Sequence, residues 1–147
     1  MKRLSLLLCL LMPAFVFAQF DDYIPDSIVT ADCDGKQFMS VETLPSVKGG
    51  ETALSDSLSA YLKRRNVVIK DGKATFVFLV TTKSQIFETR QLGGDFKVER
   101  VFREGLKTYA NMWIPAVQNF RKVCAMVRLE VAFSGDKMSV KIGKYMP

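Results

Sequence analysis

Few side chains in this 147-residue sequence could do chemistry, and cysteines are the most reactive of them. The chain has no histidine, and it shows no nucleophile elbow, phosphate loop or carboxylate pair with a spacing suited to proton transfer. Asp32, Cys33 and Asp34 stand together, but a cluster without histidine and without a second ligand pair is typical of a solvated turn. We therefore expect a protein that is not an enzyme and that uses neither a cofactor nor a metal.

The three cysteines raise the question of a disulfide. Cys9 lies in the apolar N-terminal run, which leaves Cys33 and Cys124. A bridge between these two would close a long loop and contribute about 3 to 5 kcal/mol in an oxidising compartment. Because Cys33 lies in a polar segment and Cys124 on a predicted strand, with nothing in the sequence that brings them together, unpaired cysteines are the favoured interpretation. The disulfide is the alternative.

Residues 1–18 have the pattern of a signal peptide. A basic start at Lys2 and Arg3 precedes an apolar run and a small-residue cleavage site that ends at Ala18. A membrane span needs about 20 apolar residues, and Pro13 interrupts this run. We expect cleavage near Ala18 and a periplasmic or secreted protein. Loss of Lys2 and Arg3 lowers the formal charge from +6 to +4, and no cluster of basic and stacking aromatic residues suggests nucleic acid.

The rest of the chain divides into three parts. Removing 18 of the 147 residues leaves 129, enough for one domain but not for two. Residues 19–47 are polar and broken by prolines, which predicts an extended leader. Residues 48–135 carry the periodic apolar pattern of a folded domain, and residues 136–147 are predicted to be a C-terminal tail.

Four elements of that domain precede its last strand. Apolar residues recur at helical spacing in Glu51–Arg65 and in Val98–Asn111, which predicts two amphipathic helices. Lys73–Thr82 alternates with period two, as a strand does. A reversal at Lys83-Ser84 then leads into a returning strand over Gln85–Leu92.

The last stretch, Trp113–Phe133, is the one that these elements must position. Pro115 cannot lie inside a helix, so residues 113–119 are predicted to be a tight connection. Lys122–Phe133 then forms a long strand with one apolar face, made by Val123, Ala125, Val127, Leu129, Val131 and Phe133. The predicted fold is a two-layer α+β domain of order α-β-β-α-β, with two helices on one face of a three-stranded antiparallel sheet.

Two short motifs, one before the first predicted helix and one before the last predicted strand, resemble those of a known protein family. Gly49, Gly50 and Glu51 stand before the first helix, and Trp113, Pro115 and Ala116 stand before the last strand. From about Asp34 to Phe133, the chain resembles the C-terminal domain of TonB-type energy transducers, in the form common in Bacteroidetes. It looks like a stand-alone, secreted form of that domain.

Three departures from the family are visible. The family usually has Gly where Phe120 stands and Asp-Gly where Lys83-Ser84 stands, so we expect two turns that depend on positive φ to be built differently here. A complete transducer would also have a membrane anchor and a long linker, which we do not expect in this chain.

The resemblance implies a non-catalytic binding module of the cell envelope. Its last strand would pair with a short peptide of an outer-membrane transporter, or of another envelope protein, by strand addition. Arg128 and Glu130, pointing away from the helices, would select the incoming side chains. The implied partner-binding residues are Arg121, Val123, Val127, Arg128, Glu130 and Phe133.

An alternative is an envelope domain that binds cell-wall glycan or another acidic ligand. It would use the basic face of the second predicted helix, formed by Lys97, Arg100, Arg103 and Lys107 with Tyr109 or Trp113. A solvated mixture of charges is the common explanation for such a face. The sequence leaves the oligomeric state open, a homodimer included, and we expect membrane association only through partners.

Overall fold

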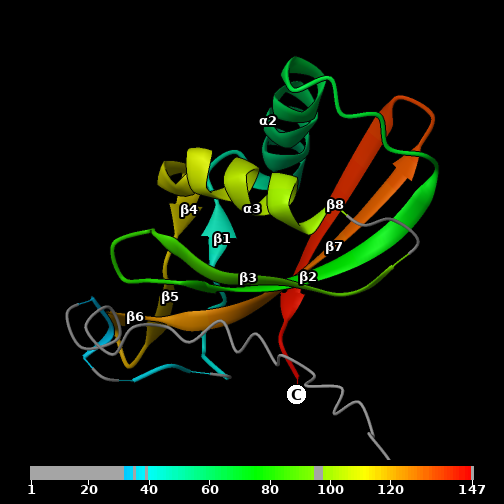
Figure 1. Cartoon of the computed structure of the whole chain (residues 1–147). Coiled ribbons are helices and arrows are strands. Elements are labelled where there is room, and N and C mark those ends of the chain that lie inside the picture. Colours follow the sequence, from blue (N-terminus) through cyan, green and yellow to red (C-terminus); the bar gives the residue numbers. More distant parts are fainter. Residues whose placement is uncertain (1–31, 35, 39, 95–97, 147) are drawn as a thin grey trace, which may run out of the picture.

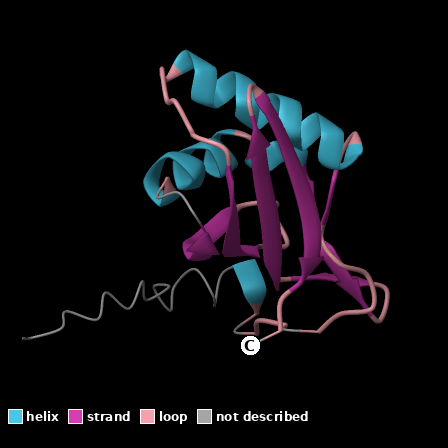
Figure 2. Cartoon of the chain, turned by 90° about the vertical axis from the view of Figure 1, so that its right-hand side faces the viewer, coloured by secondary structure: helices cyan, strands magenta, loops and turns pink. Residues whose placement is uncertain are grey.

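The computed structural model describes residues 32–34, 36–38, 40–94 and 98–146, so the predicted signal peptide lies outside the described residues. The largest sheet has four antiparallel strands in the order β3-β2-β7-β8 (Figure 1). These strands are β2 (Gly72–Val80), β3 (Ile86–Gly94), β7 (Ala125–Ser134) and β8 (Lys137–Lys144). The helices are α2 (Gly50–Arg64) and α3 (Glu99–Thr108). Figure 2 shows the two long helices at one side of the strands.

Two short strand pairs flank this sheet. β1 (Ser46–Val47) pairs with β4 (Trp113–Ile114), which follows a 3-10 turn, η1 (Ala110–Met112). β5 (Ala116–Gln118) forms a hairpin with β6 (Arg121–Val123). The described residues therefore form two helices and eight strands in three sheets. The class is α+β, but the predicted single three-stranded sheet is wrong.

The strand of the main sheet that was not predicted from the sequence is β8, which lies within residues 136–147, the predicted C-terminal tail. In β8, Met138, Val140 and Ile142 alternate with lysine and serine, and their side chains contact the main core. This is the period-two pattern of a half-buried strand. Lysines at positions 137, 141 and 144 gave the segment a polar composition that concealed the alternation.

The core lies between the helices and one face of the main sheet. Helix α2 buries Leu54, Leu58 and Leu62 against it, and α3 buries Phe102 and Leu106. The predicted apolar face of the last strand is confirmed from Val127 to Val131, where these two residues and Leu129 belong to this core. Trp113 packs edge-to-face on Phe78, with ring centroids 5.1 Å apart. Within the described residues, no helix is long and apolar enough to cross a membrane.

The opposite face of the sheet is partly covered by the described part of the leader, through Cys33. A disulfide joins Cys33 to Cys124, with the Cα atoms 5.4 Å apart, so the favoured interpretation of unpaired cysteines is wrong. The two half-cystines form a second small core with Val77, Leu79 and Met126. A leader that runs beside the start of β7 brings the cysteines together, and no local sequence signal reports such a long-range contact.

Both turns that lack the family's glycines still adopt left-handed backbone conformations. Ser84 has φ 63°, and Asn119 and Phe120, the two turn residues between β5 and β6, have φ 50° and 61°. Positive φ at both central residues is the geometry of a type I′ hairpin. The expectation that these turns are built differently is therefore wrong. A residue with a Cβ adopts this conformation at a cost of roughly 1–2 kcal/mol.

Candidate functional site

The strand predicted to bind a partner has no free edge along β7. One side pairs with β2, from Gly72↔Phe133 to Val80↔Ala125. The other side pairs with β8, from Ser134↔Lys137 to Val127↔Lys144. Beyond the end of β8, Phe38 of the leader pairs with the chain at the start of β7. Its N–H donates to the Cys124 carbonyl, and its carbonyl accepts a hydrogen bond from the Met126 N–H. The protein's own chain therefore occupies the edge on which the predicted strand addition depended.

The predicted partner-binding residues are not gathered in one surface. The Val127 side chain is buried in the core, and Phe133 is half-buried against the same core. Arg128 and Glu130 form an ion pair of 3.1 Å on the face opposite Val127 and Leu129. Arg121 and Val123 lie apart from them, on β6, and Arg121 is exposed. Only Arg128 and Glu130 are brought together.

The motif residues occupy structural positions. Gly49 and Gly50 have φ 81° and 78° at the start of α2, and a Cβ on Gly49 would come within 2.9 Å of the Ala53 Cβ. A side chain there would be strained, which explains the glycines. Trp113 and Ala116 are buried, as is Pro115 between them.

The outer edge of β8 is closed by helix α2. The Ile142 N–H donates to Glu51 Oε1 at 2.6 Å, and Ser55 Oγ donates to the Met138 carbonyl at 2.5 Å. Both backbone groups point away from β7, so the helix satisfies polar groups that an edge strand would otherwise leave free. Glu51 also lies in the first turn of α2, where a negative charge is favourable. The sequence indicated Glu51 as a motif residue and as an acidic residue at the start of the helix, but not as a partner of the last strand, and it did not indicate Ser55.

The other end of the sheet, β3, is built differently. No described strand pairs with its outer side. Its register with β2 shifts at two places, and Glu88 has φ 50°. Gly94 has φ 136°, and a Cβ on it would lie 2.3 Å from the Lys73 carbonyl oxygen, so only glycine fits there. Arg90 and Leu92 are exposed near this end of the strand.

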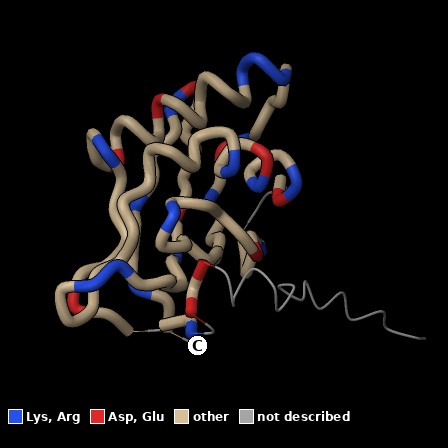
Figure 3. The backbone as a smooth tube through the Cα atoms, turned by 90° about the vertical axis from the view of Figure 1, so that its left-hand side faces the viewer, with Lys and Arg blue, Asp and Glu red and all other residues tan. Residues whose placement is uncertain are grey.

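The helix face predicted to bind glycan carries paired charges. Arg103 bonds to Glu99 at 2.7 Å, and Arg100 bonds to Glu104 at 3.3 Å. Figure 3 shows acidic and basic positions close together in the helical layer. The Tyr109 hydroxyl accepts a hydrogen bond from Arg64, and Trp113 lies in the core. Lys97 lies outside the described residues. Among the described members of this set, Lys107 is therefore the exposed cation that forms no ion pair with a described residue, and the described part of the face is not a strongly basic surface.

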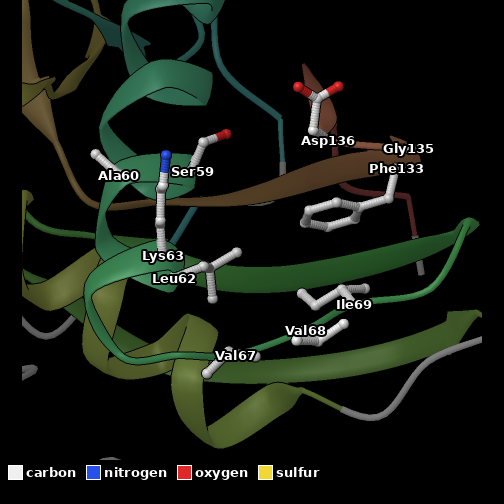
Figure 4. A pocket seen from close by; sticks show the side chains of 10 residues that line it. All are labelled: Ser59, Ala60, Leu62, Lys63, Val67, Val68, Ile69, Phe133, Gly135 and Asp136. Atoms are coloured by element: carbon white, nitrogen blue, oxygen red, sulfur yellow. The ribbon is translucent and has the colours of Figure 1, made fainter.

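An open apolar pocket of about 400 Å³ lies where α2 ends (Figure 4). Leu62 of the helix, Ile69 of the following loop and Phe133 of β7 provide apolar walls, and Lys63 and Asp136 add charged groups. Its volume is at the small end of the range for ligand pockets, about 300 to 1,000 Å³. Among the residues described, no group of three or more metal-binding side chains occurs.

Comparison with protein-family models, with curated proteins and with solved structures found no match for this chain. The geometry of the two outer edges of the main sheet is therefore the basis for a functional proposal.

Proposed function

We propose that the protein is a non-catalytic binding module that holds an extended peptide of another envelope protein by strand addition at β3. The supporting observation is the contrast between the two end strands. Side chains of α2 hydrogen-bond to the backbone of β8, whereas β3 ends the sheet with no described strand on its outer side. An edge strand of this kind is a template for a further strand.

The local structure of β3 determines how a peptide would bind. The two register shifts, at Leu92 and at Glu88–Thr89, leave only short regular stretches of β3, so the added strand would be short, and the bulge at Leu92 would lie within the proposed site near Arg90–Gly94. Leu92 is 57% exposed there and offers an apolar contact to an incoming side chain. A Cβ on Gly93 would meet no atom within 4 Å, so this position is open on the face of the sheet toward which a side chain there would point.

The resemblance to TonB C-terminal domains gives the proposal its partner class. On that resemblance, the peptide belongs to an outer-membrane transporter or to another envelope protein. The signal-peptide pattern of residues 1–18 supports a periplasmic location. A binding role is proposed rather than catalysis because the chain has no histidine and no nucleophile motif.

Affinity capture from an envelope extract tests the proposal with two variants. Leu92→Lys places a charged side chain beside the proposed site, and lysine on an edge strand discourages pairing. We expect it to recover much less of the transporter or envelope protein than the wild type does. Val68→Lys is the matched control, because Val68 is 93% exposed and lies in the loop after α2.

Equal recovery by the wild type and Leu92→Lys would contradict binding at β3. Loss of recovery with both lysine variants would also contradict it, since the effect would then follow from added charge and not from position. Circular dichroism of each variant shows whether the fold is retained.

A further inference from the structure

The turn between β5 and β6 presents a large apolar side chain to solvent. Phe120 is fully exposed, at 101% of its reference area. Its φ of 61° is rare for a bulky residue, and Asn119 before it also has positive φ. Strained backbone of this kind persists where the surrounding structure enforces it, and it is concentrated at functional sites.

The leader enforces this turn. The Glu42 carboxylate accepts hydrogen bonds from the Asn119 N–H and the Gln118 side-chain amide, both at 3.2 Å. The Glu42 N–H donates to Gln118 Oε1 at 2.9 Å, and Thr43 and Val117 exchange two backbone hydrogen bonds. Phe120 is therefore held in a defined position by a neighbouring segment of the chain.

Two cations follow the phenylalanine. Arg121 and Lys122 are exposed, and neither forms an ion pair with a residue that the structure describes. Because they are adjacent on a strand, their side chains leave opposite faces of the hairpin. Long basic side chains can keep their charged ends at a polar surface while an apolar group beside them enters a less polar region. The β5–β6 pair lies at the end of the domain away from α2 (Figure 1).

We propose that this hairpin tip docks on an anionic lipid surface. The Phe120 ring enters the boundary between head groups and acyl chains, and Arg121 and Lys122 contact lipid phosphates. A contact residue for a protein pocket usually lies at the centre of a well-packed patch. Phe120 instead projects alone, next to cations, which fits a lipid surface. The proposal concerns direct membrane contact, beyond the expected association through partners, and it does not depend on β3.

Vesicle sedimentation tests the proposal. The wild type and all variants are expressed with residues 1–18 and purified after secretion, so that they share the same N-terminus. The vesicles contain phosphatidylcholine alone or phosphatidylcholine with phosphatidylglycerol. We expect the wild type to bind the anionic vesicles, and Phe120→Gly to lower the partition coefficient about tenfold or more. The double variant Arg121→Gln/Lys122→Gln should also bind them more weakly and should lose most of the salt dependence.

Two controls distinguish loss of the Phe120 membrane contact from loss of folding and from the general effect of removing an exposed apolar side chain. Glycine suits a left-handed turn, so Phe120→Gly should be at least as stable as the wild type. Val68→Ser removes another exposed apolar side chain, from the loop after α2, and should leave vesicle binding unchanged. A wild-type protein that does not sediment with anionic vesicles would overturn the proposal. A Phe120→Gly protein that binds as strongly as the wild type would also overturn it.

Discussion

The two end strands of the main sheet, β8 and β3, each have an outer side with which no other described strand of the sheet pairs. They differ in what protects that side. At β8, Glu51 and Ser55 of helix α2 hydrogen-bond to backbone groups on the outer side of the strand. At β3, no described strand covers the outer side, and two register shifts interrupt the ladder instead. Bulges limit the length over which another chain can pair, whereas a covering helix blocks the edge. The comparison indicates that a partner strand would meet less competition at β3.

This difference also moves the proposed contact away from β7. The resemblance placed the partner beside residues 121–133, on a strand expected to be last in its sheet. Here β8 pairs with β7 from Ser134 to Val127, and Phe38 bridges to Ala125 beyond it. A peptide could reach that edge only if β8 left it, which would expose Val140 and Ile142.

Removal of β8 should have the largest effect on stability. A chain that ends at Asp136 loses Met138, Val140 and Ile142 from the core, and each buried apolar side chain is worth about 1.5 to 3 kcal/mol when buried completely. We expect the shortened domain to be unfolded or aggregated by circular dichroism. A chain that lacks only residues 146 and 147 is the control. A chain ending at Asp136 with an unchanged melting temperature would show that β8 is not part of the stable sheet.

Loss of the disulfide should have the next largest effect. Cys33 and Cys124 are 91 residues apart, and chain entropy predicts about 4 to 5 kcal/mol for a loop of this length. The paired variant Cys33→Ser/Cys124→Ser should therefore unfold at a much lower denaturant concentration. The wild type under reducing conditions should shift to a similar midpoint. No shift in either experiment would mean that the leader is not fastened to β7 by this bridge.

Removing the two helix contacts to β8 should have a smaller effect. Glu51→Ala and Ser55→Ala should each lower the free energy of unfolding by about 1 kcal/mol, because each leaves a backbone group without its partner. Asp56→Ala, on the same helix, is the control. Amide hydrogen exchange gives a local test: the Ile142 N–H should exchange faster in Glu51→Ala than in Asp56→Ala. Equal exchange would show that Glu51 does not protect this edge.

A substitution on the open edge should have the smallest effect on stability. Leu92 is 57% exposed, so Leu92→Lys should change the free energy of unfolding by no more than about 0.5 kcal/mol. Thermal unfolding measures this change. A large loss would indicate that Leu92 supports the fold, and reduced capture by this variant would then not report on binding.

Local pattern was sufficient for most of the two-layer core. The predicted helix Glu51–Arg65 corresponds to α2, and the strand Lys73–Thr82 contains most of β2, because each has one clearly periodic apolar face. The predicted helix Val98–Asn111 covers α3 and most of η1. Such periodicity reports which side of an element is buried, but it does not report which element lies beside it.

The remaining features depend on contacts between distant residues. Glu51 meets Ile142 across 91 positions, and Glu42 meets Asn119 across 77, so no local pattern could pair them. The conformation of Phe120 could not be predicted for a second reason. Phenylalanine has no preference for a left-handed turn, and the conformation is held by hydrogen bonds to the leader and not by local propensity.

Site-specific photo-crosslinking tests the difference between the two edges most directly. A benzophenone amino acid replaces Leu92 on β3 in one variant and Lys141 on β8 in another, and both proteins are irradiated in the same envelope extract. If β3 is the binding edge, position 92 crosslinks to a short segment of an envelope protein, identified by mass spectrometry, and position 141 does not. Crosslinks from position 141 to such a segment, with none from position 92, would contradict the proposed site.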